Sequence, residues 1–184
     1  MMKLMKKQSG LTLIELMITL TVAAILLVVA VPSFVSSMKD NRRTTYINEL
    51  VSSLNLARSE AAKSNSTVAI CPSSDGVACA GDNYDSGWIV FRNTDGDQPP
   101  VVDSPGEVIL RTHVSTPQPG TSLRATAGVD TGINFQPSGR PGTFGDVTYC
   151  DDRGATNARV VVVNLVGVIM ASDDHPDGSA MTCP

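Results

Sequence analysis

The sequence predicts an α+β fold in which a long N-terminal helix precedes a β-rich head. Residues 11–31 are almost all apolar, and beyond them apolar residues recur every three or four positions, which is the period of one helix face. From Thr67 onward, short β-branched runs alternate with Gly, Pro, Asp and Asn, as strands alternate with turns. The chain has 184 residues. About 150 residues lie beyond the apolar run, enough for one domain with one core.

The first element is a basic leader, residues 1–10, followed by an apolar run, residues 11–31, in which Glu15 is the only charge. A run of this length can span a bilayer as a helix. An ionised group at membrane depth costs about 2.5–3.5 kcal/mol even on lenient scales, so it normally has a functional partner. A signal anchor needs no glutamate, and a cleaved secretory signal needs a small-residue site that Val31-Pro32-Ser33 does not provide. The leader charges are three lysines: Lys3, Lys6 and Lys7.

The second element is the amphipathic continuation of the same helix over residues 32–64. Pro32 is expected to kink the helix, because proline removes one backbone hydrogen bond and crowds the preceding turn. Asn65 and Ser66 are expected to end it, so the helix runs from Leu11 to about Ser64, roughly 80 Å at 1.5 Å per residue. Residues 65–184 then form the head. The expected dry face of the helix consists of Ile47, Leu50, Leu54, Ala57 and Ala61.

The head is expected to contain seven short strands separated by turn residues. Asn93–Asp97 is predicted to be a hairpin turn between the second and third strands, and not a calcium loop, because no glutamate follows at the EF-hand spacing. Gln98–Gly106 and Thr116–Gly120 are expected to be proline-rich loops. The predicted strands are Thr67–Cys71, Gly87–Arg92, Glu107–His113, Ile133–Gln136, Val147–Cys150, Ala158–Leu165 and Val168–Ala171.

Four cysteines permit three disulfide connectivities. Behind a membrane signal the head is expected to reach an oxidising compartment, where an even set of cysteines favours disulfides. We favour Cys71–Cys79, which closes a short loop, and Cys150–Cys183, which ties down the chain end. A zinc site is the alternative, but the sequence has no Cys-x-x-Cys and only two histidines.

Composition and motifs argue against catalysis and nucleic-acid binding. Neither His113 nor His175 has a neighbouring Ser or Cys arrangement that suggests a catalytic triad. The acidic stretch Asp173–Gly178 has groups that could bind a cation, and we interpret it as a solvated loop. The formal charge is −4, and −7 without the three leader lysines, so no basic footprint covers the head. Aromatic residues make up only 4%, too few to suggest base-stacking platforms. We expect no enzyme activity, no cofactor and no metal.

The segment Gly10-Leu11-Thr12-Leu13-Ile14-Glu15-Leu16, behind its basic leader, resembles the type III signal of type IV pilins and type II secretion pseudopilins. The resemblance implies that prepilin peptidase cuts between Gly10 and Leu11 and methylates Leu11. It also implies a role for Glu15 in assembly, in which its carboxylate pairs with the methylated amino group of Leu11 in a neighbouring subunit.

The head carries several motifs in an order that resembles the GspH/FimT branch of minor pilins and minor pseudopilins. That resemblance implies the pilin fold, with the helix packed on an antiparallel, β-sandwich-like head. The motifs are Cys71-Pro72-Ser73, Gly87-Trp88-Ile89-Val90-Phe91, Phe135-Gln136-Pro137-Ser138-Gly139-Arg140 and Cys150-Asp151-Asp152-Arg153-Gly154 followed by Val160–Val163.

The function implied is that of a minor type IV pilin, a structural subunit in pilus biogenesis. Its expected partners are other minor and major pilins, prepilin peptidase and the inner-membrane assembly platform. The expected location is the bacterial inner membrane, with the head in the periplasm, and then the fibre. The alternatives are a type II secretion minor pseudopilin and a DNA-uptake pilin.

Resemblance ties DNA uptake in this branch to a Gly-Arg-x-Arg motif near the C-terminus. Gly167-Val168-Ile169-Met170 stands there instead, which removes the cations that would contact phosphate. Weak DNA contact is left to Arg140, Arg153 and Arg159, and acidic neighbours dilute these arginines, so DNA binding is not expected.

Overall fold

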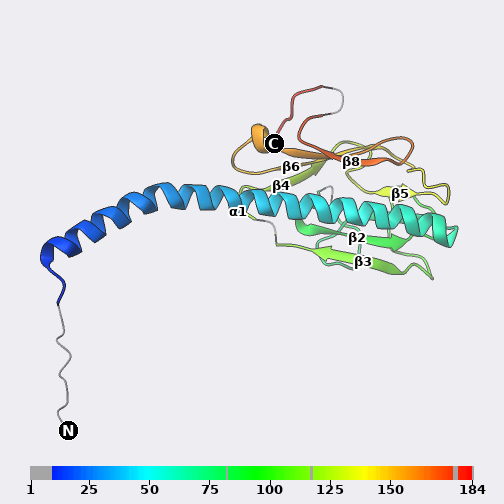
Figure 1. Ribbon diagram of the computed structural model, residues 1–184. Helices are drawn as coiled ribbons and strands as arrows, with labels where there is room; N and C mark the ends of the chain where they lie inside the picture. The colour runs from blue at the N-terminus through cyan, green and yellow to red at the C-terminus, as the bar shows by residue number, and fades with distance from the viewer. Residues whose placement is uncertain (1–9, 82, 117, 176–177, 184) are drawn as a thin grey trace, which may run out of the picture. The chain divides into compact units, whose positions relative to one another are not determined.

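The computed structural model describes residues 10–81, 83–116, 118–175 and 178–183. Its chain forms two compact units, residues 1–41 and residues 42–184. The described part of the first unit consists of residue 10, a short lead-in and the N-terminal part of helix α1 (Leu13–Ser64), drawn in blue in Figure 1. Of the expected leader, residues 1–9 lie outside the described residues.

Helix α1 has the extent that the sequence predicts, to within two residues. It begins after Thr12 and continues through Pro32 without a break. A kink of the helix axis at Pro32 stays a prediction. Asn65 adopts a left-handed conformation with φ of 49°, and Ser66 N–H donates to Ala61 O at 3.3 Å. This hydrogen bond is the Schellman closure of a helix end, so the predicted stop at Asn65 and Ser66 is confirmed.

The head, residues 42–184, contains two antiparallel sheets of four strands each. The first sheet has the order β3-β2-β1-β5, with β1 (Val68–Pro72), β2 (Gly87–Arg92), β3 (Ile109–Val114) and β5 (Ile133–Phe135). The second has the order β4-β6-β7-β8, with β4 (Ser122–Ala125), β6 (Gly145–Cys150), β7 (Arg159–Val163) and β8 (Ile169–Ser172). Two short 3-10 helices, η1 (Tyr84–Ser86) and η2 (Ala155–Asn157), join strands.

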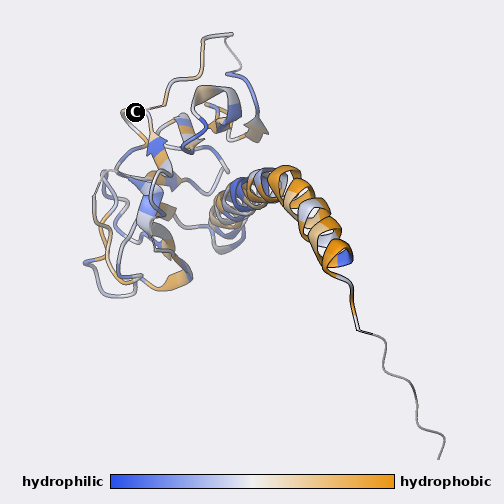
Figure 2. Ribbon diagram, turned by 90° about the vertical axis from the view of Figure 1, so that its left-hand side faces the viewer, coloured by the Kyte–Doolittle hydropathy of each residue, from blue (hydrophilic) through white to orange (hydrophobic). Residues whose placement is uncertain are grey.

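The core of the head lies where the C-terminal part of α1 meets both sheets. All five residues of the predicted dry face are buried: Ile47, Leu50, Leu54, Ala57 and Ala61. They form one cluster with residues of the first sheet, such as Val90, and of the second, such as Val161. Each fully buried aliphatic or aromatic side chain contributes about 1.5–3 kcal/mol. Figure 2 shows the change in hydropathy along α1, from a largely apolar N-terminal part to a mixed C-terminal part.

The predicted strands are all present, with ends shifted by up to two residues, and one strand was missed. β4 was not predicted, because Ser122-Leu123-Arg124-Ala125 buries only Leu123 and lacks a β-branched alternation. The turn predicted at Asn93–Asp97 opens the connection between β2 and β3, which pair as antiparallel neighbours. This connection runs over residues 93–108, so the turn and the loop predicted at Gln98–Gly106 together cover all but its last two residues.

Both favoured disulfides are present. Cys71 bonds to Cys79 over a separation of 8 residues, and Cys150 bonds to Cys183 over a separation of 33. The alternative zinc site is therefore wrong, since all four sulfurs are used in these bonds and none is left as a thiolate ligand.

Candidate assembly surfaces

The N-terminal part of α1 presents apolar side chains to solvent on all its faces. No described residue of this helix before Lys39 is more than partly covered, and Leu13, Ile25 and Val29 are 78%, 67% and 69% exposed. By length and composition this helix could cross a membrane. An exposed apolar area of this size marks a surface that is covered by lipid or by other protein chains.

Thr12 caps the first turn of this helix. The N–H of Glu15 donates to Thr12 Oγ1 at 3.3 Å, and the N–H of Leu16 donates to Thr12 O at 3.1 Å. Thr12 and Glu15 thus have the spacing of a capping box, and the carboxylate lies in the first turn, where the helix dipole favours negative charge. The Thr-x-x-Glu spacing is a local capping signal, which the sequence displays in the same residues that resemble a cleavage signal.

Glu15 differs from the other polar residues in the apolar segment. The hydroxyls of Thr19 and Thr21 donate to the carbonyl oxygens of Leu16 and Ile18, both at 2.8 Å. The Glu15 carboxylate has no hydrogen bond or ion pair within the part of the chain that the structure describes. Neighbouring turns therefore satisfy the hydroxyls but leave the carboxylate in need of a partner from elsewhere.

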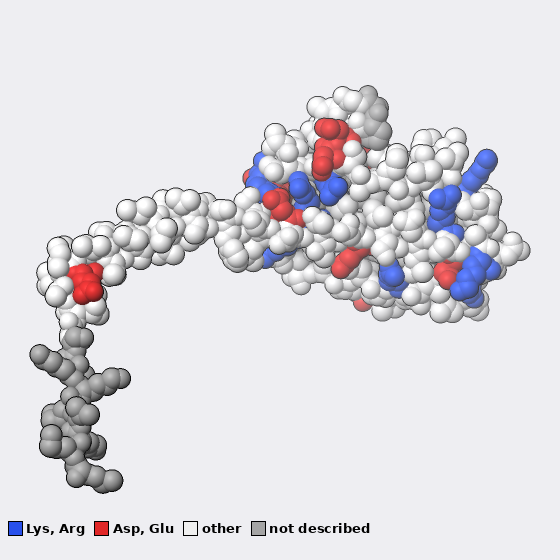
Figure 3. Space-filling view, in the orientation of Figure 1, with Lys and Arg blue, Asp and Glu red and all other residues white. Residues whose placement is uncertain are grey.

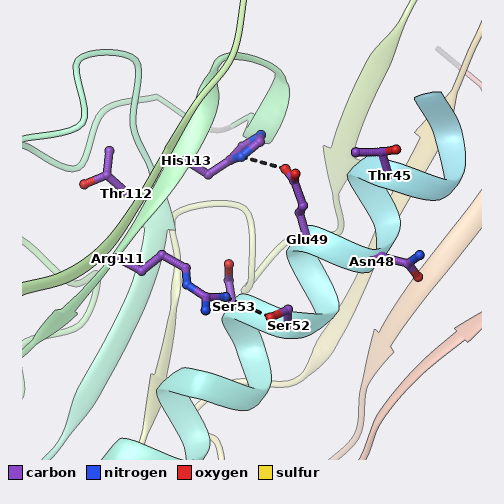
Figure 4. Close-up of a pocket in the computed structure, with 8 residues that line it drawn as sticks. All are labelled: Thr45, Asn48, Glu49, Ser52, Ser53, Arg111, Thr112 and His113. Atoms are coloured by element: carbon purple, nitrogen blue, oxygen red, sulfur yellow. Dashed lines mark hydrogen bonds and ion pairs between the residues drawn. The ribbon is translucent and has the colours of Figure 1, made fainter. Parts of the chain in front are cut away.

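In the head, a polar groove of about 490 Å³ lies between α1 and β3. Figure 4 shows its two walls facing each other. Nδ1 of His113 lies 2.7 Å from Oε2 of Glu49, and Nη1 of Arg111 donates to Oγ of Ser52 at 2.8 Å. The helix contributes Thr45, Asn48, Glu49, Ser52 and Ser53, and the strand contributes Arg111, Thr112 and His113.

The His113 ring is held on three sides. It stacks on Trp88 with a centroid distance of 4.1 Å and meets Tyr46 edge-on at 5.9 Å. Its Nε2 atom is buried without a hydrogen-bond partner. Burial lowers the pKa of His113 below its usual 6.5, and the nearby Glu49 carboxylate only partly opposes this effect. The ring is therefore mainly neutral at pH 7, with Nδ1–H donating to Glu49.

The three arginines named for weak DNA contact do not form one patch. The Arg153 guanidinium lies 2.7 Å from the buried carboxylate of Asp151, and that of Arg159 lies 3.3 Å from Asp173. Both arginines come after β6 in the chain. Between them lies Asn157, whose carbonyl oxygen accepts a hydrogen bond from Arg43 of α1 at 2.8 Å. On the face seen in Figure 3, basic side chains of the head stand in separate groups with acidic ones among them.

Arg140 lies at another place along α1. The preceding residue, Gly139, accepts a hydrogen bond from Arg58 Nε at 3.0 Å. Arg58 and Arg43 are fifteen residues apart on one helix, which corresponds to about 22 Å. Arg140 therefore lies apart from Arg153 and Arg159, and these three arginines do not form a continuous cationic track.

Three carboxylates that sequence reasoning did not group together meet in the loop between β2 and β3. Asp95, Asp103 and Glu107 bring oxygen atoms within 4.8 Å of one another. Glu107 accepts hydrogen bonds from the N–H groups of Thr94, Asp103 and Ser104, and Asp95 accepts one from Ser104 Oγ at 2.6 Å. The Ser104 bond is the main reason that the pKa of Asp95 is lowered. These contacts fasten the long loop.

Comparisons with known proteins agree with this architecture. A family model described as "Type II transport protein GspH" matches residues 46–167, and one described as "Prokaryotic N-terminal methylation motif" matches residues 5–31. No curated protein matches the chain.

Three solved structures resemble this one. The type IV minor pilin FimU of Pseudomonas aeruginosa (strain PAO1) matches in space group P21 with a TM-score of 0.56 and 20% identity, over 77% of this chain and 94% of that chain. The same protein in space group P65 gives 0.53 and 19% identity, over 74% and 95%. The minor pseudopilin EpsH from the type 2 secretion system of Vibrio cholerae gives 0.48 and 13%, over 71% and 95%.

Proposed function

Since this chain belongs to the GspH family of type II transport proteins, we propose that it is a structural subunit which assembles through its apolar N-terminal helix. The chain is a minor type IV pilin or a GspH-like minor pseudopilin, with the pilin fold and an N-terminal methylation motif. Of the two, we propose the minor pilin, a subunit that takes part in pilus biogenesis.

The observation that carries the proposal is the lone carboxylate of Glu15 at the start of an exposed apolar helix. In a bundle of such helices the carboxylate would be buried, and a buried charge without a partner is strongly destabilising. The methylated amino group of Leu11 in a neighbouring subunit would supply the opposite charge at the same depth. Pairing the two groups would favour one stagger between adjacent helices.

Processing and location follow from the same segment. Prepilin peptidase would remove residues 1–10 by cutting after Gly10 and would methylate Leu11. Residues 11–31 would hold the subunit in the inner membrane, with the head in the periplasm, until the assembly platform moves it into the fibre among other minor and major pilins.

The other interpretations receive less support. A DNA-uptake pilin would need a cationic surface, whereas two of the candidate arginines are paired with aspartates and the third lies elsewhere. An enzyme would need a constellation of nucleophile, base and orienting group. In the groove, His113 contacts the Glu49 carboxylate and aromatic rings, and within the described residues no hydroxyl or thiol is hydrogen-bonded to either ring nitrogen.

Intact-mass analysis of the membrane-extracted protein tests the processing step. We expect loss of residues 1–10 and the addition of one methyl group. Gly10→Val should block the cut, because a branched side chain would occupy the place where the peptidase meets none. An unprocessed wild-type chain, or a cut beyond Pro32, would refute the assignment.

Variants at Glu15 test the assembly step separately. Glu15→Val should be cleaved and stay in the membrane, yet be absent from sheared surface fibres, because its amino-terminal partner would be buried unpaired. Glu15→Asp keeps the charge and is the matched control. If deletion of the gene abolishes protein secretion and leaves surface piliation normal, the pseudopilin alternative replaces the pilin.

A further inference from the structure

The first sheet has an open edge along β3. β3 is the terminal strand of its sheet and, within the described residues, pairs only with β2. The N–H of Ser115 donates to Ser86 O, so these two facing residues form a hydrogen-bonded pair of the β2–β3 ladder. Because bonded and non-bonded pairs alternate in an antiparallel ladder, the N–H and C=O groups of Thr112 and Val114 point away from β2.

This edge is longer than the other sheet edges. β3 has six residues, whereas the edge strands β4 and β8 have four each and β5 has three. The one register shift of the β2–β3 pair lies between Val90 and Phe91, at the far end from Val114. Native proteins usually protect such an edge with a bulge, a proline or a short strand, and here the irregularity is confined to one end. From Arg111 to Val114 the pairing is regular, so this part of the edge is suited to strand addition.

The polar groove between α1 and β3 runs beside this edge and gives it charge selectivity. Arg111 and His113 project from β3 toward α1, two positions apart. Within the part of the chain that the structure describes, Arg111 uses one donor atom, in its bond to Ser52, so most of its five N–H groups remain for an incoming carboxylate. Glu49 carries the opposite charge beside His113, whose pKa is lowered by burial.

We propose that β3 accepts an extended segment of another protein as a fifth strand of the first sheet. This inference rests on the proposed assembly role and names the contact that the head would make. The added strand would bond to the outward backbone groups of Thr112 and Val114. Its side chains on the groove side recur every second residue, so an acidic residue would face Arg111 and a basic residue two positions away would face Glu49.

The occupant is a different protein and not a second copy of this chain. None of the eight strands of the described head contains an acidic residue two positions from a basic one. Elsewhere in the described chain an acid precedes an arginine by two positions in helix α1, at Asp40 and Arg42, and in the turn after β6, where Asp151 is paired with Arg153 itself. A copy of this chain would therefore not supply both complementary charges from an extended segment. The partner is identified by chemistry as an exposed, extended segment with the pattern acid-x-base.

In-cell photocrosslinking of the full chain tests this inference. The probe is benzoylphenylalanine in place of Asn48, an exposed residue that lines the groove. We expect an adduct whose partner peptide is an extended segment with acid-x-base spacing. Val114→Pro should lower its yield at least tenfold, because that N–H points outward and its loss breaks no bond of the sheet. Arg111→Glu should lower the yield similarly.

The matched control is Ala171→Pro on β8, the edge strand of the other sheet. The Asn164 N–H donates to Val168 O, so these facing residues form a hydrogen-bonded pair of the β7–β8 ladder. Ala171 faces Val161 in a non-bonded pair, and its N–H therefore points away from β7. Ala171→Pro should leave the adduct unchanged. No adduct, an adduct unaffected by Val114→Pro, or one that maps to a helix or to a second copy of this chain would overturn the inference.

The intact mass of the same samples separates the two proposals. A chain that is cleaved and methylated normally but gives no adduct refutes strand addition alone. A wild-type chain that is not processed refutes the assembly role on which strand addition rests.

Discussion

His113 and Glu49 join the edge strand β3 to helix α1 through a contact of 2.7 Å between Nδ1 and Oε2. The two residues are 64 positions apart in the chain. Because β3 has a neighbour on one side only, this side-chain contact supports the free side of the strand against the helix.

Lowering the pH from 7.5 to 5.5 should destabilise the head through His113. Its pKa in the folded state is lowered by burial, so the unfolded chain, with a pKa near 6.5, binds the proton first. Stability is therefore fully present above about pH 6.5 and falls as the pH decreases toward the folded-state pKa, by at most about 1.4 kcal/mol per pH unit.

The measurement is urea unfolding of the full chain in detergent micelles, followed by the fluorescence of Trp88. His113→Gln is the control, since it cannot be protonated in this range. If the wild type and His113→Gln lose the same stability between pH 7.5 and 5.5, the histidine is not the group responsible.

Gly87→Ala should destabilise the β2–β3 pair. Gly87 has a φ of 123°, and a Cβ atom there would lie 2.0 Å from His113 O. A residue forced into this conformation costs about 1–3 kcal/mol, and the clash adds to it. We expect a loss of more than about 2 kcal/mol in urea unfolding.

Gly81→Ala is the matched control for that change. Gly81 also has a positive φ, 81°, but apart from its chain neighbours no atom of the described residues lies within 4 Å of its added Cβ. It should cost only about 1 kcal/mol. Equal losses for both variants would show that the carbonyl of His113 does not restrict position 87.

Removing the two disulfides should cost different amounts. In the chain-entropy account, a bond that closes a longer loop stabilises more. The Cys150→Ala/Cys183→Ala pair should lose about 3.7 kcal/mol and the Cys71→Ala/Cys79→Ala pair about 2.5 kcal/mol. Denaturant midpoints of the double variants check the order, and the reverse order would show that loop closure is not the main source of the stabilisation. Wild-type protein should show no free thiol when denatured without reductant.

Arg153→Ala should lower stability and should not change DNA binding. Asp151 has only 2% of its side chain exposed, and the variant removes the guanidinium that lies 2.7 Å from this buried carboxylate. Such a loss costs about 3 kcal/mol. Arg140→Ala should be close to neutral.

Mobility shifts with duplex DNA at physiological salt provide the second readout. Wild type and both variants should show little binding, because phosphate contacts need clustered cations. Tight, salt-sensitive binding that is lost when Arg140, Arg153 and Arg159 are replaced, with normal piliation, would establish a DNA receptor instead.

The helix and most strands could be predicted because their signals are local. The apolar positions Ile47, Leu50 and Leu54 have helical spacing, and Asn65 readily adopts the left-handed conformation that ends a helix. β4 could not be predicted, because its stability comes from backbone pairing with β6, and Leu123 is its one buried residue.

The candidate site was predicted only in part, because some of its features are local in the sequence and others depend on contacts between distant segments. The position of Glu15 in an apolar run is a local signal that the sequence displays. The groove between α1 and β3 depends on residues from 45 to 113 that meet only after the sheet has formed. The pairing of Arg153 with Asp151, two positions earlier, depends on the turn that follows β6.

The Cys150–Cys183 bond makes the segment that contains β7 and β8 a covalently closed ring. In a crowded assembly of related heads, a terminal hairpin with loose ends could exchange with the same hairpin of a neighbour and entangle the two chains. The ring hinders this exchange, because Cys183 would have to leave its own Cys150. Each head is thereby kept as a separate folding unit that can enter or leave an assembly without drawing its neighbour's strands with it.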